Sequence, residues 1–210
     1  VSHGDEDHIS GIRELLEEGL IGNLVLTKAS AENEKCKALA AIACQKGTKV
    51  WYISEGDSYS SGKWSFACLY PRNSLPAGTE ENDTSMVLSV SCPGAAFLFT
   101  GDVTENAERA VVINCGDALG VSGKITVLKC AHHGSRYSSS ETFLYAARPD
   151  LTVISCGKYN SYGHPSAEAM QRIAASGSSM LFTMDGGAVT VESSGKVRTY
   201  KHYSGSNIGG

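Results

Sequence analysis

Residues 127–135 read Val-Leu-Lys-Cys-Ala-His-His-Gly-Ser, an apolar run that ends in two adjacent histidines and a glycine. Residues 97–102 have a similar arrangement, because Phe-Leu-Phe-Thr-Gly-Asp carries an aspartate at the end of another apolar run. Short apolar runs of this kind are typical of buried strands. The two stretches therefore predict a sheet whose edge presents imidazole and carboxylate groups, which are ligands for Zn, Mn or Fe.

The first residues of the chain are dense in the same chemistry. Two histidines and two aspartates fall within six positions: His3, Asp5, Asp7 and His8. A loop can turn such side chains toward one point, and consecutive Asp7 and His8 can both face a second ion if the loop enters a helix. The alternative is a polar loop in which Asp7 only caps a helix that begins at Ile9.

A further group lies in residues 160–165, Asn-Ser-Tyr-Gly-His-Pro, between a predicted strand and a predicted helix. His164 could bind a metal or hold a substrate oxyanion, and Pro165 suits a first helical turn. Of His132 and His133, one ring would bind a metal, and the other would donate to phosphate or act as an acid. Each group has a plain structural alternative: a helix cap, a surface histidine pair or a helix-entry loop. Taken together, the four groups of ligand-type residues indicate a two-metal hydrolase site.

The periodicity of apolar residues predicts a mixture of helices and strands. The predicted helices lie around 12–18 and at 31–45, 104–113, 140–147 and 166–175. The predicted strands are 24–26, 48–54, 63–70, 85–91, 95–100, 125–131, 151–155, 179–183, 188–192 and 197–200. This order predicts a layered α/β (α+β) domain over 1–203, followed by a flexible tail at 204–210.

Composition excludes several classes of protein. Of the 210 residues, 41% are hydrophobic and 19% are charged, which excludes intrinsic disorder. A formal net charge of −4 excludes a polybasic nucleic-acid binder, although bound metal ions could still supply the local positive charge of a nuclease. No apolar run approaches the roughly 20 residues of a membrane span, so we expect no membrane contact from this chain.

Seven cysteines occur without a CxxC pair, which argues against a zinc ribbon and a disulfide framework. We expect them to be mostly small buried residues, and their odd number favours a reducing, cytoplasmic compartment. An active-site loop normally follows a strand, and too few residues precede His3 to form one. We therefore expect the natural protein to extend upstream of Val1.

Five ordered motifs resemble the metallo-β-lactamase superfamily. They are most similar to its branch found as the soluble C-terminal domain of the DNA-uptake channel protein ComEC. The motifs are SHGDEDHISG at 2–11, NDTS at 82–85, TGD at 100–102, HHGS at 132–135 and YGHP at 162–165. The similarity runs from Ser2 to about Val191. It implies an αββα sandwich with the site at one edge between two sheets, although the superfamily's strands before the first motif are absent here.

The resemblance also implies a ligand set. One metal would be held by His3, Asp5 and a histidine of the His132–His133 pair, the other by Asp7, His8 and His164, with Asp102 bridging them. Asp5 stands where a histidine is usual, which shifts the preference from zinc toward manganese or magnesium. The usual middle histidine is missing, so either the histidine pair or Asn82 would take its place; the alternative for Asn82 is a structural turn.

The function implied is that of a metal-dependent phosphodiesterase or nuclease with two divalent ions, Zn or Mn, with Fe or Mg as alternatives. A metal-bridging hydroxide would attack phosphorus in a substrate such as single-stranded DNA. The expected catalytic residues are Asp7, Asp102, His132, His133 and His164. The candidate substrate-phosphate contacts are Ser135, Lys158, Asn160 and Tyr162.

Two other functions stay open. One is a phosphorylcholine esterase, or another ester hydrolase of the same fold. A choline site would need an aromatic cage, whereas we expect Trp51 and Trp64, which lie in strand-like runs, to pack in the core. The other is an inactive, metal-containing binding module, against which the retention of every proposed ligand type argues.

Overall fold

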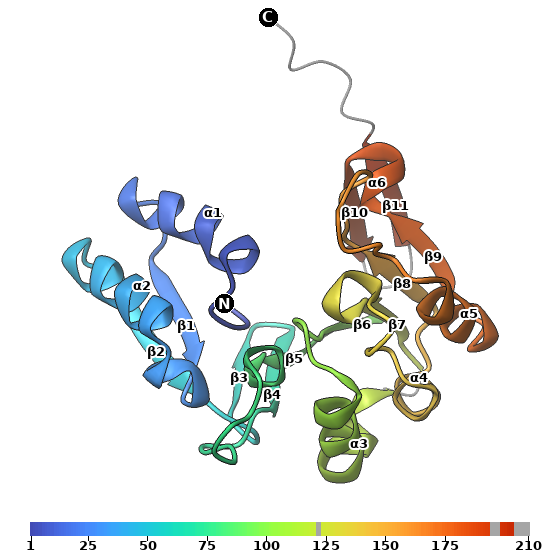
Figure 1. The fold of residues 1–210 in the computed structure, drawn as a ribbon, viewed down its shortest axis with the longest axis horizontal. Helices are drawn as coiled ribbons and strands as arrows, with labels where there is room; N and C mark the ends of the chain where they lie inside the picture. The colour runs from blue at the N-terminus through green and yellow to red at the C-terminus, as the bar shows by residue number, and fades with distance from the viewer. Residues whose placement is uncertain (121–122, 194–197, 204–210) are drawn as a thin grey trace, which may run out of the picture.

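The computed structural model describes residues 1–120, 123–193 and 198–203, the last range for its backbone only (Figure 1). The predicted tail at 204–210 and Val197, at the start of the last predicted strand, lie outside the described residues. Within them, no helix combines the length and the apolar character that crossing a membrane requires.

A seven-stranded mixed sheet forms the larger part of the structure, in the order β3-β4-β5-β6-β7-β8-β9. Its strands are β3 (Ser58–Ser61), β4 (Trp64–Tyr70), β5 (Val87–Cys92), β6 (Ala95–Phe99), β7 (Ile125–Lys129), β8 (Leu151–Ile154) and β9 (Ser179–Phe182). Neighbours from β3 to β6 are antiparallel, and those from β6 to β9 are parallel. Pro93 and Gly94 join β5 to β6 in the predicted hairpin, with Gly94 at φ 85°.

Three helices connect the parallel strands: α3 (Glu105–Leu119), α4 (Glu141–Ala147) and α5 (Ala167–Ala175). Their apolar faces share one core with the sheet, which includes Val111, Leu128 and Phe143. Because β6, β7 and β8 are parallel, with Phe99 beside Lys129 and Lys129 beside Val153, the segments that follow them emerge at one edge. This register brings 100–102, 130–133 and 155 together.

A smaller N-terminal unit lies beside the large sheet (Figure 1). It pairs β1 (Asn23–Thr27) in parallel with β2 (Lys49–Ile53), covered by α1 (Glu6–Glu17) and α2 (Glu34–Gln45). Polar contacts join it to the segment before β5. The Glu81 carboxylate accepts from the Gly4 amide at 3.0 Å and from Asn33 Nδ2 at 2.9 Å, and the Met86 amide donates to the Ser2 carbonyl at 2.9 Å.

The remaining elements are short. They are the 3₁₀ turns η1 (Ala29–Glu32), η2 (Glu81–Thr84) and η3 (Ala131–Gly134), the helix α6 (Thr183–Gly186), and the antiparallel pair β10 (Ala188–Ser193) and β11 (Arg198–Tyr203). The layered α/β class predicted from the sequence is confirmed.

Several local predictions were wrong or incomplete. β3 was missed because Ser58–Ser61 is an exposed, serine-rich strand without an apolar pattern. Helix α1 begins at Glu6 after Asp5, so Asp7 lies inside the helix and does not cap it. Trp51 and Trp64 are not in the core, since 53% and 43% of their surfaces are exposed.

The cysteines are all free, and four of the seven are buried.

Residues 136–140, which follow the histidine pair, are fixed by two side chains from neighbouring helices. Glu108 of α3 is buried and accepts hydrogen bonds from the Ser139 and Ser140 amides at 2.5 and 2.8 Å. Arg172 of α5 donates to the Ser138 and Ser139 carbonyls at 2.8 and 2.9 Å. Residues 136–140, and with them the histidine pair that precedes them, are thereby attached to α3 and α5.

Burial raises the pKa of Glu108, although the Ser139 and Ser140 hydrogen bonds and the charge of Arg172 oppose it. A carboxyl with a raised pKa holds its proton more tightly in the folded state than in the unfolded state. The free energy of unfolding should therefore fall as pH rises from about 4.5 through the folded pKa. Glu108→Gln, although less stable overall because it loses an acceptor, should remove this part of the pH dependence.

Denaturant unfolding across this pH range would measure the effect. Glu105→Gln, at an exposed position on the same helix, is the matched control and should keep the wild-type pH dependence. An unchanged pH dependence in Glu108→Gln would contradict the assignment.

Candidate metal centre

Asp102 follows β6 and is held almost fully buried at the sheet edge. Gly101 makes this turn with φ 54°, and a Cβ there would lie 2.7 Å from Ser85 Cβ and 2.9 Å from Ser2 Cβ. The Asp102 amide donates to Ser85 Oγ at 3.0 Å. The close approach of three segments thus requires glycine at 101 and fixes the carboxylate beside it.

His132 and His133 follow β7 within η3, and both have left-handed backbones, with φ 47° and 54°. Such a conformation costs a non-glycine residue about 1–2 kcal/mol, and strain of this kind is concentrated at functional sites. The His133 ring donates from Nδ1 to the Ser155 carbonyl at 2.7 Å. This leaves Nε2 with its lone pair, as in histidines that bind metals.

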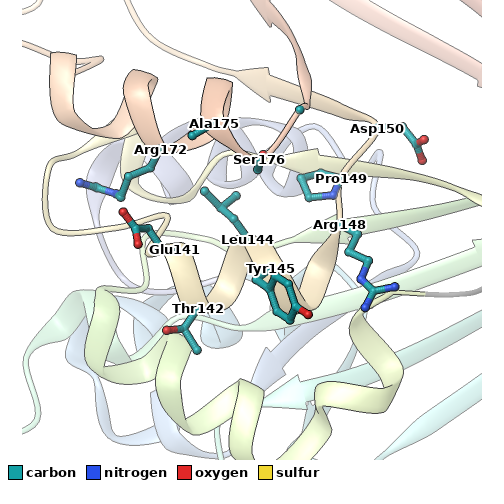
Figure 2. Close-up of a pocket in the computed structure, with 11 residues that line it drawn as sticks. Glu141, Thr142, Leu144, Tyr145, Arg148, Pro149, Asp150, Arg172, Ala175 and Ser176 are labelled. Carbon is teal, nitrogen blue, oxygen red and sulfur yellow. The ribbon is translucent and has the colours of Figure 1, made fainter.

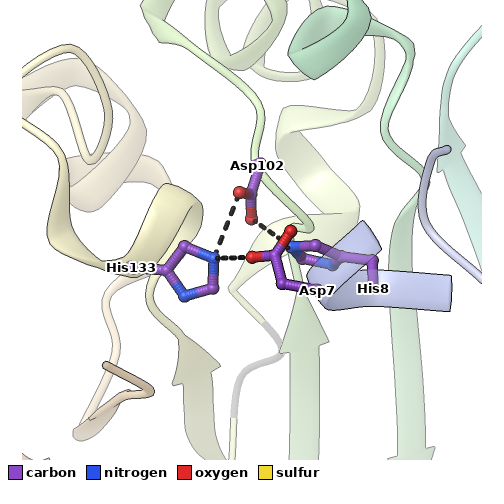
Figure 3. A group of neighbouring side chains, drawn as sticks. All are labelled: Asp7, His8, Asp102 and His133. Carbon is purple, nitrogen blue, oxygen red and sulfur yellow. Dashed lines mark ion pairs between the residues drawn. The ribbon is translucent and has the colours of Figure 1, made fainter. Parts of the chain in front are cut away.

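Asp7 and His8, in the first turn of α1, complete a group of four with Asp102 and His133 (Figure 3). His133 Nε2 lies 3.1 Å from Asp7 Oδ2 and 3.3 Å from Asp102 Oδ2. His8 Nε2 lies 3.3 Å from Asp102 Oδ1 and 3.6 Å from Asp7 Oδ2. One candidate ligand atom from each residue falls within 4.8 Å of all the others.

His3 and Asp5 form a second pair beside this group. His3 is fully buried, its ring lies 4.3 Å from that of His8, and its Nε2 is 3.5 Å from Asp5 Oδ2. The Ser2 hydroxyl lies 3.1 Å from Nδ1 of both histidines, which leaves both Nε2 atoms for other partners. Two of the ligands that the resemblance implied thus lie next to the four-residue group.

His132 and His164 lie outside the four-residue group, with their rings 5.5 Å apart and the His132 ring 6.4 Å from that of His133. The structure therefore places His133, and not His164, with Asp7 and His8. Asn160 holds the loop of His164, because its amide group bonds both the His164 amide and the His164 carbonyl, at 2.9 and 2.6 Å.

The other residues predicted to contact substrate phosphate, and the 82–85 segment, lie in different environments. Ser135 is buried, and its hydroxyl accepts from the Tyr137 amide at 3.4 Å. Lys158 and Tyr162 are exposed. In the 82–85 segment, the Asp83 carboxylate accepts from the amide and hydroxyl of Thr104 at 2.8 and 3.0 Å. Together with the Ser85 contact to Asp102, this bond favours the structural role for the segment.

Six buried side-chain atoms among the described residues have no hydrogen-bond partner: His3 Nε2, His8 Nε2, Asp102 Oδ1, His132 Nδ1, His133 Nε2 and His164 Nδ1. All belong to residues predicted as ligands from the sequence. Leaving one buried polar group unsatisfied costs about 1–3 kcal/mol, so six at one site need an explanation. Imidazole nitrogens and carboxylate oxygens are the ligands of Zn and Mn, and the residues therefore fit a divalent cation.

The pKa values of the histidines differ across the site. Burial lowers the pKa of His3, His132 and His164, which favours the neutral ring that a metal requires. Contact with Asp102 raises the pKa of His133. Burial alone would raise the pKa of Asp102, but His133, His8 and the charge of Lys129 hold it well below its usual range.

Sequence reasoning missed Lys129. Its Nζ donates to the Gly101 carbonyl at 3.1 Å and lies 3.6 Å from Asp102 Oδ1. The signal was present, because Lys129 is a charged residue at the end of an apolar strand and immediately precedes the Cys-Ala-His-His turn. Ser2 and Ser85 belong to the motifs at 2–11 and 82–85, but the sequence did not indicate the supporting role of their hydroxyls.

A separate cleft of about 910 Å³ lies at α4 and α5 (Figure 2). Tyr145, Arg148 and Arg172 are among the residues that line it, and none of the proposed metal ligands does. The cleft is therefore distinct from the candidate metal centre.

Comparison with known proteins supports the resemblance to the metallo-β-lactamase superfamily. Residues 71–158 match the family described as the metallo-beta-lactamase superfamily. This range includes Asp102, His132 and His133, but neither the opening motif nor His164. The resemblance to the superfamily is confirmed, and the mixed α/β structure is consistent with its fold.

Three curated proteins are similar to parts of this chain or to nearly all of it. ComE operon protein 3 of Bacillus subtilis (strain 168) is 29% identical over 203 residues, 97% of this chain and 25% of that protein. Competence protein ComA of Neisseria gonorrhoeae is 36% identical over 130 residues, 59% of this chain and 18% of the relative. Recombination protein 2 of Haemophilus influenzae is 28% identical over 175 residues, 82% and 19% of the two lengths. The chain thus resembles the ComEC branch and spans a quarter or less of each relative.

Gly101→Ala tests whether the tight turn supports the site. Gly19→Ala is the matched control, since Gly19 also has positive φ but nothing within 4 Å of an added Cβ. Gly19→Ala should cost about 1–2 kcal/mol of unfolding free energy, from its backbone alone. Gly101→Ala should cost more and should weaken Mn²⁺ binding, because it displaces Ser2 and Ser85. Equal stability losses with unchanged calorimetric Mn²⁺ affinity would contradict this.

Proposed function

We propose that the chain is a metal-dependent hydrolase of phosphodiester bonds in nucleic acid. The six unpartnered ligand atoms at the sheet edge carry this proposal. The similarity to competence and recombination proteins supports nucleic acid as the substrate. The net charge of −4 means that attraction to phosphate must come from the site.

In this proposal Asp7, His8, Asp102 and His133 would hold one divalent cation. His3 and Asp5, together with Asp102, would hold a second. Bound divalent cations would lower the pKa of a water nucleophile and neutralise charge on the phosphoryl oxygens. Manganese or zinc fits this mixed nitrogen and oxygen donor set.

The protein groups around the cations have separate roles. Ser2 orients the His3 and His8 rings, and the Ser155 carbonyl orients His133. Lys129 fixes the Gly101 backbone and with it the direction of Asp102. His132 and His164 lie beside the group and would donate hydrogen bonds to the phosphoryl or leaving oxygen.

Asp102→Asn tests the proposal. The wild-type chain should cleave a 5′-labelled single-stranded oligonucleotide in Mn²⁺ and lose this activity in a chelator. The variant should be more than about 100-fold slower, because even outer-shell partners of metal ligands cost 10–100-fold. Gel electrophoresis of the labelled products measures the rate.

Asp117→Asn, at an exposed position on α3, is the matched control and should cleave at the wild-type rate. Absence of Mn²⁺-dependent cleavage by the wild-type chain, or full activity in Asp102→Asn, would overturn the proposal.

A further inference from the structure

Tyr162 extends a run of aromatic rings outward from the candidate metal centre. One face of its ring stacks on His164, with centroids 6.0 Å apart and planes inclined by 17°. The His164 ring contacts His132 at 5.5 Å, and His132 lies 6.4 Å from the ring of His133. Tyr162 is 82% exposed. One face of the Tyr162 ring therefore contacts the site, and the rest of the ring is accessible to solvent.

The loop that carries this ring is held in place. The Asn160 amide group donates to the Gly157 and His164 carbonyls at 2.8 and 2.6 Å and accepts from the His164 amide at 2.9 Å. The Ser166 amide, just beyond, donates to the Gly134 carbonyl at 2.9 Å. A platform held in this way loses little conformational entropy when a ligand stacks on it.

Positive charge lies on the same loops. Lys158 is exposed on the Tyr162 loop, with its Nζ 5.8 Å from the centre of the Tyr159 ring. Arg136 is exposed on the adjoining loop, where its carbonyl accepts from Arg172 at 2.9 Å. A single strand bound by proteins typically needs this combination, in which aromatic rings stack on bases and cations face the backbone.

We propose that Tyr162 is a stacking platform for a base of single-stranded nucleic acid whose phosphate lies at the metal centre. This inference rests on the proposed function and specifies the form of its substrate. Bases within a duplex already stack on one another, so a free base face is offered by a single strand. The only ring contact of Tyr162 within the described residues is His164, a flat arrangement that suits a base and differs from the cage that surrounds a quaternary ammonium.

Tyr162→Ala tests the platform with two labelled single-stranded oligomers of equal length, one of thymidine nucleotides and one of abasic residues. Wild type should prefer the base-containing strand, in KM with Mn²⁺ and in Kd by fluorescence anisotropy in a chelator. The variant should reduce this preference about 10-fold. Tyr162→Phe keeps the ring and should keep the preference.

Tyr145→Ala is the matched control, because Tyr145 is 76% exposed on α4 and contacts Arg148 outside the site. It should show the wild-type preference. Mn²⁺-dependent cleavage with an unchanged preference in Tyr162→Ala would overturn the platform and leave the proposed function standing. Loss of the preference in binding, without cleavage by wild type, would support the platform and overturn the proposed function.

Discussion

The structure depends on the burial of one carboxylate, Asp102, at the edge of the large sheet. An ionised carboxylate removed from water is costly unless positive groups and hydrogen-bond donors face it. Here His8, His133 and Lys129 lie within 3.6 Å of its oxygens. They come from α1, from the turn after β7 and from β7 itself. The groups that surround this carboxylate therefore connect the N-terminal unit to the parallel half of the sheet.

Two features of the chain make that convergence possible. The parallel register of β6, β7 and β8 brings the ends of these strands to one edge, where Gly101 lets Ser2 and Ser85 approach the aspartate loop. The left-handed backbones of His132 and His133 then separate the two rings, so that His133 belongs to the four-residue group and His132 contacts His164. Strain is concentrated where the candidate ligands lie, as expected of a functional site.

Asp102, His132 and His133 could be predicted from the sequence because they follow apolar runs, and His3, Asp5, Asp7 and His8 because they are crowded into six positions at the start of the chain. Which of these residues lie together could not be predicted from the sequence. The assignment of His133 to Asp7 and His8 depends on backbone angles that single residues do not reveal, and the role of Lys129 depends on the spacing between neighbouring strands. β3 was missed for a similar reason, because an exposed strand is defined by its pairing with β4 and has no apolar pattern of its own.

The central claim is that the unpartnered atoms of His3, His8, Asp102 and His133 at the sheet edge bind divalent cations. Anomalous diffraction from crystals of the protein grown with Mn²⁺ tests it most directly. The account predicts a strong anomalous peak among the side chains of Asp7, His8, Asp102 and His133. A map with no peak there at saturating Mn²⁺, or with peaks only at exposed carboxylates elsewhere, would contradict it.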